Sequence, residues 1–154
     1  MRRTSRRGSG LIEFAFGFSA LALLFVGLAD VSISMIVYHQ LNAAVSNGAR
    51  YASAVEFDEP AHRFADRIRN LVACGNPEGE PCPGTAPGLE PEHVKVSWRR
   101  DGAGRPETIT VSIDGYAMPG VFSRRVLRGG PSATVRFAGS WRPGGAAAFR
   151  RTSR

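Results

Sequence analysis

The sequence predicts an α+β protein with one long N-terminal helix, a second amphipathic helix and a small three-stranded antiparallel sheet. Three patterns indicate this fold: an apolar run from Phe14 to Tyr38, helically spaced apolar residues after Pro60, and alternating apolar residues from Val94 onward. A chain of 154 residues is long enough for an anchor and one small domain. We expect a cytoplasmic leader at residues 1–8, a transmembrane and stalk helix at 9–53, an extracytoplasmic α+β head at 54–142 and a mobile tail at 143–154.

The apolar run is long enough to cross a bilayer. It spans about 25 residues with Asp30 as its one charged side chain, whereas a membrane-spanning helix needs about 20 apolar residues and the core of a secretory signal has about 7–15. The arginines before the run are Arg2, Arg3, Arg6 and Arg7, and the next one after it is Arg50. The positive-inside rule therefore predicts a single-pass protein with a cytoplasmic N-terminus and its head outside.

Past the bilayer, the helical pattern continues. Leu41, Val45, Gly48 and Ala52 lie on one stripe at three- and four-residue spacing, with polar residues between them. We expect the helix to emerge as an amphipathic stalk and to end near Ser53.

A second helix is expected after a break at residues 56–60. Asp58 can cap it, Pro60 is tolerated in its first turn, and Gly75 fits a C-terminal stop. Its apolar face contains Ala61, Phe64, Ile68, Leu71 and Val72.

Three strands are expected in the second half of the chain. Their alternating apolar residues are Val94, Val96 and Trp98, then Ile109, Val111 and Ile113, then Ala133, Val135, Phe137 and Trp141. Residues 101–104 read Asp-Gly-Ala-Gly and predict a hairpin between the first two strands. The stretch from Met118 to Leu127 is ambiguous and reads as a loop or a short helix.

The two cysteines, Cys74 and Cys82, flank a stretch rich in Gly, Pro and Glu. Outside the cytoplasm, such a pair most simply forms a disulfide, with free thiols or a metal site as the alternatives. A zinc site would need two more ligands, and no histidine in the sequence has suitable spacing. We therefore expect a disulfide and no metal, provided that the predicted orientation holds.

The charge pattern argues against nucleic-acid binding. The net charge is +7, but the excess arginine lies at the two chain ends rather than on one folded face. His39, His62 and His93 are isolated in the sequence, which also lacks a recognisable Ser/His/Asp set or nucleotide-binding loop. We expect no catalytic residues, no cofactor and no enzymatic activity.

Glu13 needs an explanation, because a carboxylate at the edge of an apolar span is costly. Its position near a helix N-terminus and lipid headgroups is one explanation. The other is proteolysis after Gly8, which would free the amine of Ser9 four residues before Glu13. In a bundle of like helices, that amine could meet the carboxylate of a neighbour, and the pair at Glu13-Phe14 would set the assembly register. Cleavage after Gly10 is less suitable, because Glu13 would then be third rather than fifth in the mature chain.

Two further features of the apolar run could serve helix packing. Small residues recur at Gly17, Ala20, Gly27 and Ser34, and one small-residue face lets helices approach closely in lipid; chance use of Ala and Gly is the alternative. Asp30 lies roughly 25 Å along the helix from Glu13. It either reaches solvent at the outer boundary or makes a polar contact with a partner helix.

These residues together resemble a known family. Gly8, Glu13 and Phe14, the arginine-rich leader and the following apolar helix are similar to the Tad (tight adherence) class of type IV pilin-like proteins. The segment 40–52, with Gly48-Ala49-Arg50, resembles the post-membrane segment of TadE-like pseudopilins, and Asp30 resembles an acidic position of that family. The resemblance covers roughly residues 6–53. TadF- and TadG-like relatives begin in the same way, so the subtype stays open.

The resemblance implies a function. A prepilin peptidase would cut the precursor on the cytoplasmic side, and the mature chain would be a minor pilin of a Tad pilus that serves adhesion, biofilm formation and secretion. Its partners would be that peptidase, other pilins and pseudopilins through the N-terminal helix, the inner-membrane assembly platform and the lipid bilayer, without nucleic acid. It would lie in the bacterial inner membrane with a periplasmic head, or in an extracellular pilus.

Two other hypotheses remain. The chain could be a signal-anchored extracytoplasmic binding module unrelated to pili, in which Glu13 would be replaceable. It could also be exported and cut by ordinary signal peptidase near Ala20-Leu-Ala22, although the apolar run continues past that site.

Overall fold

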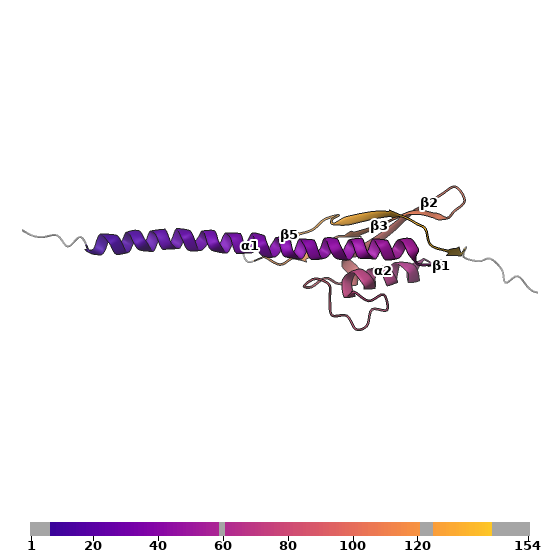
Figure 1. The fold of residues 1–154 in the computed structure, drawn as a ribbon, viewed down its shortest axis with the longest axis horizontal. Coiled ribbons are helices and arrows are strands. Elements are labelled where there is room, and N and C mark those ends of the chain that lie inside the picture. The colour runs from indigo at the N-terminus through magenta and orange to yellow at the C-terminus, as the bar shows by residue number, and fades with distance from the viewer. Residues whose placement is uncertain (1–6, 59–60, 121–124, 143–154) are drawn as a thin grey trace, which may run out of the picture.

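The computed structural model describes residues 7–58, 61–120 and 125–142. The predicted tail at 143–154 and most of the predicted leader lie outside these ranges. Helix α1 (Arg7–Ala54) is continuous and about 70 Å long. Figure 1 shows the other elements gathered along the C-terminal half of α1, while its N-terminal half extends alone.

The α+β fold expected from the sequence is confirmed. After α1 come β1 (Phe57–Asp58), α2 (His62–Cys74), the 3-10 helix η1 (Pro91–His93), β2 (Val94–Arg100), β3 (Pro106–Ile113), β4 (Ala117–Met118), β5 (Arg125–Val126), β6 (Ser132–Arg136) and β7 (Trp141–Arg142). The main sheet has the order β2-β3-β6 with antiparallel neighbours. The predicted hairpin joins β2 to β3, and the amide of Gly104 donates to the carbonyl of Asp101 at 3.0 Å.

Both helices pack on one face of this sheet. Helix α1 contacts β3 and β6, whereas α2 contacts β2 and α1. The inward strand residues Ile109, Val111 and Ile113 are fully buried, while neighbouring strand positions are partly or fully exposed. The alternation in the sequence therefore identified the buried face correctly, because successive strand residues point to opposite sides of a sheet.

The predicted stalk is part of the head. Leu41, Val45 and Ala52 are fully buried, and they belong to one core together with residues of α2 and the sheet. The stripe was expected to be the apolar side of a helix that emerges from the membrane. In the structure this side is covered, because the sheet and α2 pack on it directly.

Helix α2 confirms one predicted boundary and corrects the other. Gly75 adopts a left-handed conformation with φ 76°, and its amide donates to the carbonyl of Leu71, as expected for a C-terminal cap. The start was wrong: the N-cap is Ala61, which offers no side-chain hydrogen bond. Asp58 instead belongs to β1, which pairs with β7 near the end of the described residues.

Two predictions for the C-terminal part need correction. Trp141 is not part of the third strand of the main sheet; β6 ends at Arg136, and Trp141 pairs with Phe57 in a separate parallel pair, β1–β7. The ambiguous stretch is not a helix where it is described. Met118 pairs with Arg125 in the short antiparallel pair β4–β5.

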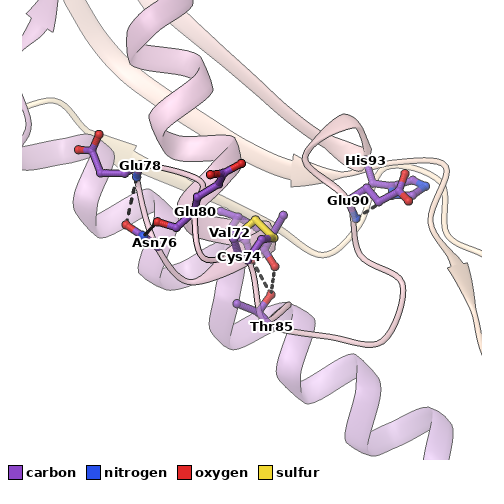
Figure 2. The surroundings of a disulfide bond; sticks show 10 residues. Val72, Cys74, Asn76, Glu78, Glu80, Thr85, Glu90 and His93 are labelled. Carbon is purple, nitrogen blue, oxygen red and sulfur yellow. Dashed lines mark hydrogen bonds between the residues drawn. A yellow bond between two sulfur atoms is a disulfide. The ribbon is translucent and has the colours of Figure 1, made fainter.

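The structure contains the predicted disulfide between Cys74 and Cys82. It joins the end of α2 to the following loop (Figure 2). The loop has further ties to the head: the amide of Thr85 donates to the carbonyl of Ala73 at 2.8 Å, and the hydroxyl of Tyr116 donates to the carbonyl of Pro87 at 2.7 Å. The disulfide is therefore one of several bonds that hold this loop against α2.

Removal of the disulfide is expected to destabilise the head by about 2–3 kcal/mol, because a cross-link restricts the unfolded chain according to the loop that it closes. The variant is Cys74→Ala/Cys82→Ala, which leaves no polar group in the buried site of Cys74. Urea unfolding of the detergent-solubilised protein measures the change. The control is the unsubstituted protein with a reductant, whose urea midpoint should match that of the variant. If the variant keeps the midpoint of the oxidised unsubstituted protein, the prediction is wrong.

Candidate functional site

The N-terminal half of α1 presents an uncovered apolar surface. Its large side chains from Leu11 to Leu28 are 39–75% exposed. Among the described residues, one helix is long and apolar enough to cross a membrane, and its candidate range is Gly10–Ala54. Such a surface is suited to contact with lipid, because the transfer of apolar side chains from water to an apolar environment is favourable.

Glu13 lies near the start of this surface. Its side chain is exposed in the helix, while Leu11, Ile12 and Phe14 around it are apolar and exposed as well. Ser9 and Glu13 are four residues apart in α1 and therefore lie about one turn apart on the same face. A charge created at Ser9 would thus be within one helical turn of the carboxylate.

Asp30 occupies an unexpected position. It is the one polar or charged residue among those described that is buried, with 7% exposure, although Ala29 and Val31 beside it are exposed. Its own chain therefore covers it, and the expectation that it reaches solvent does not hold. A contact with a partner helix stays a prediction.

The burial of Asp30 fits the helical spacing of the stripe that faces the head. Counting back from Leu41 in steps of three and four gives Val37, Ser34, Asp30 and Gly27, and these four are buried or partly buried. The head-facing stripe thus begins some ten residues before the predicted start of the stalk. The apolar character of the run concealed it, because both sides of the helix are apolar there.

The predicted small-residue face is open for most of its length. A Cβ added at Gly17 or Gly27 would meet nothing within 4 Å, and Ala20 is exposed. Ser34 is partly buried, and its hydroxyl donates to the carbonyl of Asp30 at 2.9 Å. Space for a second helix is therefore present at Gly17 and Ala20, whereas Gly27 and Ser34 are partly buried, and the packing role of this face stays a prediction.

Gly48 has a clear structural role. A Cβ at this position would collide with the Cγ2 atom of Val72, a fully buried residue of α2. Gly48 therefore permits the close approach of α1 and α2. Its neighbour Ala49 is 1% exposed, and Arg50 is exposed. The sequence placed Gly48 on the apolar stripe of the stalk and singled out the segment Gly48-Ala49-Arg50 by resemblance, and the structure supplies a packing reason for its first two residues.

The electrostatics of the head centre on Asp114, which follows β3. Lys95 donates to one carboxylate oxygen, and the amide of Gly129 donates to the other at 3.2 Å. These bonds, that of Lys95 first, lower the pKa of Asp114. Burial raises the pKa of the nearby Tyr116 hydroxyl. Asp114 therefore ties β2 to the segment that follows β5.

No group of three metal-ligating side chains occurs among the described residues. His93 accepts a hydrogen bond at Nδ1 from the amide of Glu90 at 3.2 Å, as part of the cap of η1. The best-supported candidate for a functional site in the described part of the chain is the uncovered half of α1, because of its exposed apolar surface.

Comparison with known proteins bears on this helix. Residues 8–50 match the family model for TadE-like protein. This segment is TadE-like. The match begins at the predicted cleavage glycine, crosses the uncovered apolar surface, and ends with Gly48-Ala49-Arg50 inside the head.

The TadE-like segment supports involvement in the Tad pilus system and, with its one apolar helix, a membrane anchor. No curated protein and no solved structure matches the chain. The later head elements, including α2 and the sheet, lie outside the matched segment.

Proposed function

We propose that the chain is a membrane-anchored pseudopilin of a Tad pilus, without enzymatic activity. The observation that carries this proposal is the coincidence of three features in one helix: Glu13 five residues after Gly8, a bare apolar surface from Leu11 onward, and a TadE-like match that starts at residue 8. An anchor unrelated to pili would need the apolar surface but not the spacing of Gly8 and Glu13.

Processing is the first step of the proposed function. A prepilin peptidase would hydrolyse the peptide bond between Gly8 and Ser9, leaving the carboxylate on the leader and a free amine on Ser9. Helix α1 begins at Arg7, so the first turn would have to unwind to enter the peptidase. Gly8 and Gly10 ease this step, because each glycine weakens a helix by roughly 0.5–1 kcal/mol relative to alanine.

Assembly is the second step. The Ser9 amine of one mature chain would meet the Glu13 carboxylate of a neighbouring pilin or pseudopilin at the assembly platform. Each charge is costly to hold alone in an apolar bundle, so pairing would favour one register between helices. Helix packing would use the small-residue face where it is open, at Gly17 and Ala20.

Localisation follows from the same features. The leader would lie in the cytoplasm, α1 would cross the bacterial inner membrane, and the disulfide-bonded head would fold in the periplasm, where disulfides persist. Whether the mature chain enters the fibre or stays at its base, it would contribute to adhesion, biofilm formation and secretion through the pilus.

The experiment is N-terminal sequencing and intact-mass measurement of the chain purified from cells with and without the prepilin peptidase. We expect a mature N-terminus at Ser9 only when the peptidase is present. Gly8→Val should abolish cleavage, because its side chain would hinder the approach of the catalytic groups of the peptidase to the peptide bond. The control Gly10→Ala should still be cut. A chain that retains Met1 in both strains would end the pseudopilin proposal.

A further inference from the structure

The β4–β5 pair and the segment after it form the end of the head that lies closest to the bare half of α1. The amide of Ala138 donates to the carbonyl of Ser53 at 2.9 Å, which fixes the C-terminal end of β6 beside the end of α1. From Ala138 back to Ser132 the strand covers about 20 Å, or about 13 residues of α1. Of the elements labelled in Figure 1 besides α1, β5 lies nearest to the extended half of the helix, and β4 pairs with it.

This position matches the bilayer boundary expected from the length of α1. From Gly10 to Asp30 a helix rises about 30 Å, which is the thickness of the hydrocarbon core. On the side away from the head, Val31, Ile36 and Tyr38 are 42–59% exposed, so α1 remains apolar past Asp30. With a hydrocarbon core that covers residues 10–30, the membrane-facing end of the head would lie at the level of the lipid headgroups.

The surface of this end has an unusual composition. Val126 is 56% exposed and is, among the described residues, the one exposed large hydrophobic side chain outside α1. Arg125 and Arg128 on either side of it are exposed as well. The nearby carboxylate of Asp114 is occupied by Lys95 and by the amide of Gly129. Two cations beside an exposed apolar residue match the chemistry of a headgroup layer, which is anionic outside and apolar beneath.

The segment is firmly attached to the head. The amide of Gly115 donates to the carbonyl of Leu127 at 2.9 Å, and the amide of Leu127 donates to the carbonyl of Tyr116 at 2.8 Å. Tyr116 is 1% exposed. A contact between this segment and the membrane would therefore set the tilt of the whole head relative to the bilayer.

We propose that Arg125, Val126 and Arg128 form a foot that docks the head onto anionic phospholipid headgroups of the leaflet where α1 leaves the membrane. The arginines bind headgroup phosphates, and Val126 lies against the glycerol region. The foot is more than 80 residues from the apolar run, so its arginines do not oppose the predicted orientation, which depends on charges within about 15–20 residues of the span. The inference rests on the membrane anchor of the proposed function.

The test uses the full chain in lipid nanodiscs and measures paramagnetic broadening of amide NMR signals by a gadolinium-labelled headgroup. We expect broadening at residues 127–129 and none at residues 102–104, at the far end of the head. The broadening should be larger in discs with 30% phosphatidylglycerol than in phosphatidylcholine alone. Each arginine near an anionic surface contributes about fivefold to docking, so Arg125→Ala/Arg128→Ala should weaken it about 25-fold.

Two control variants separate charge from fold. Arg125→Lys/Arg128→Lys should retain the broadening, since a lysine keeps the charge. Arg63→Ala/Arg67→Ala removes two exposed arginines from α2 and should leave the broadening unchanged. If the alanine variant at 125 and 128 keeps its broadening, or if the lipid composition has no effect, the proposed headgroup contact is wrong.

A paramagnetic label in the lipid acyl chains separates the test of the membrane anchor from the test of the foot. If amides of residues 14–28 are broadened by that label but residues 127–129 never respond to the headgroup label, the foot is overturned and the anchor stands. If residues 14–28 do not respond either, both are overturned. If the response at residues 127–129 grows with the number of protein copies per disc, the partner of the foot is a second copy of the chain, and the proposed lipid contact is wrong.

Discussion

Replacement of Glu13 with alanine is expected to reduce incorporation of the mature chain into pilus assemblies by more than about 100-fold. The physical reason is the proposed pair of Glu13 with the Ser9 amine of a neighbour. Removing one partner of a charge pair in a water-free environment leaves the other charge uncompensated and costs roughly 3–5 kcal/mol. Cross-linking to other pilus components, followed by quantification of the linked chain, measures the effect.

The controls for Glu13→Ala isolate assembly from earlier steps. The variant should still be inserted and cut to Ser9, because the head and the apolar surface are unchanged. Ser32→Ala alters an exposed residue of the same helix, whose hydroxyl bonds only to the carbonyl of Leu28 as far as the described contacts show, and should assemble normally. Glu13→Asp should recover part of the loss. Normal assembly of Glu13→Ala would leave only an anchored extracytoplasmic module.

Gly48→Val is expected to destabilise the head by about 3 kcal/mol, at the upper end of overpacking effects. A side chain at this position collides with the Cγ2 atom of Val72, which is fully buried. Helices α1 and α2 would have to separate, and that would expose parts of the core they share. Urea unfolding monitored by tryptophan fluorescence measures the change.

A double-mutant cycle tests the mechanism assigned to Gly48. In Gly48→Val/Val72→Ala the colliding methyl is removed, so the double variant should be more stable than the sum of the single effects predicts, by about 1–3 kcal/mol. Ala43→Val is the matched control, because Ala43 is exposed on the same helix and the change adds the same β-branched side chain. Additive effects at 48 and 72 would show that the two residues do not meet.

Much of the fold was predictable because its signals are local. The apolar run, the stripe from Leu41 to Ala52 and the alternation at Ile109, Val111 and Ile113 each report the period of one element. The stop at Gly75 was also predictable, because a left-handed residue after a helix favours glycine. These features need no knowledge of the rest of the chain.

The errors occurred where a residue serves a distant partner. Asp58 is a residue type that often caps helices, but it pairs in β1 with Arg142, more than 80 residues later. Trp141 continues the alternation of β6 but belongs to another strand pair. A two-residue strand such as β4 or β5 carries no periodicity of its own, so its pairing depends on the elements that bring it into place.

The candidate site divides in the same way. Gly8, Glu13 and the apolar span were identified from spacing, charge and length, and their assembly role stays a prediction. The importance of Gly48 and the burial of Asp30 were not predicted by physical reasoning, because each depends on what packs against α1.

The sequence by itself determined that this chain has a span-length apolar helix with one carboxylate near its start, a second helix and an alternating sheet. These properties follow from the hydrophobicity and the periodicity of residues within short segments of the sequence. Only the tertiary structure decided how far the head reaches down the helix. Val37 is buried because the head packs along α1 from the contact between Ala138 and Ser53, with β6 running parallel to the helix, and Asp30 is buried further along the same stripe. The proposed place of Arg125, Val126 and Arg128 near the lipid headgroups depends on this packing.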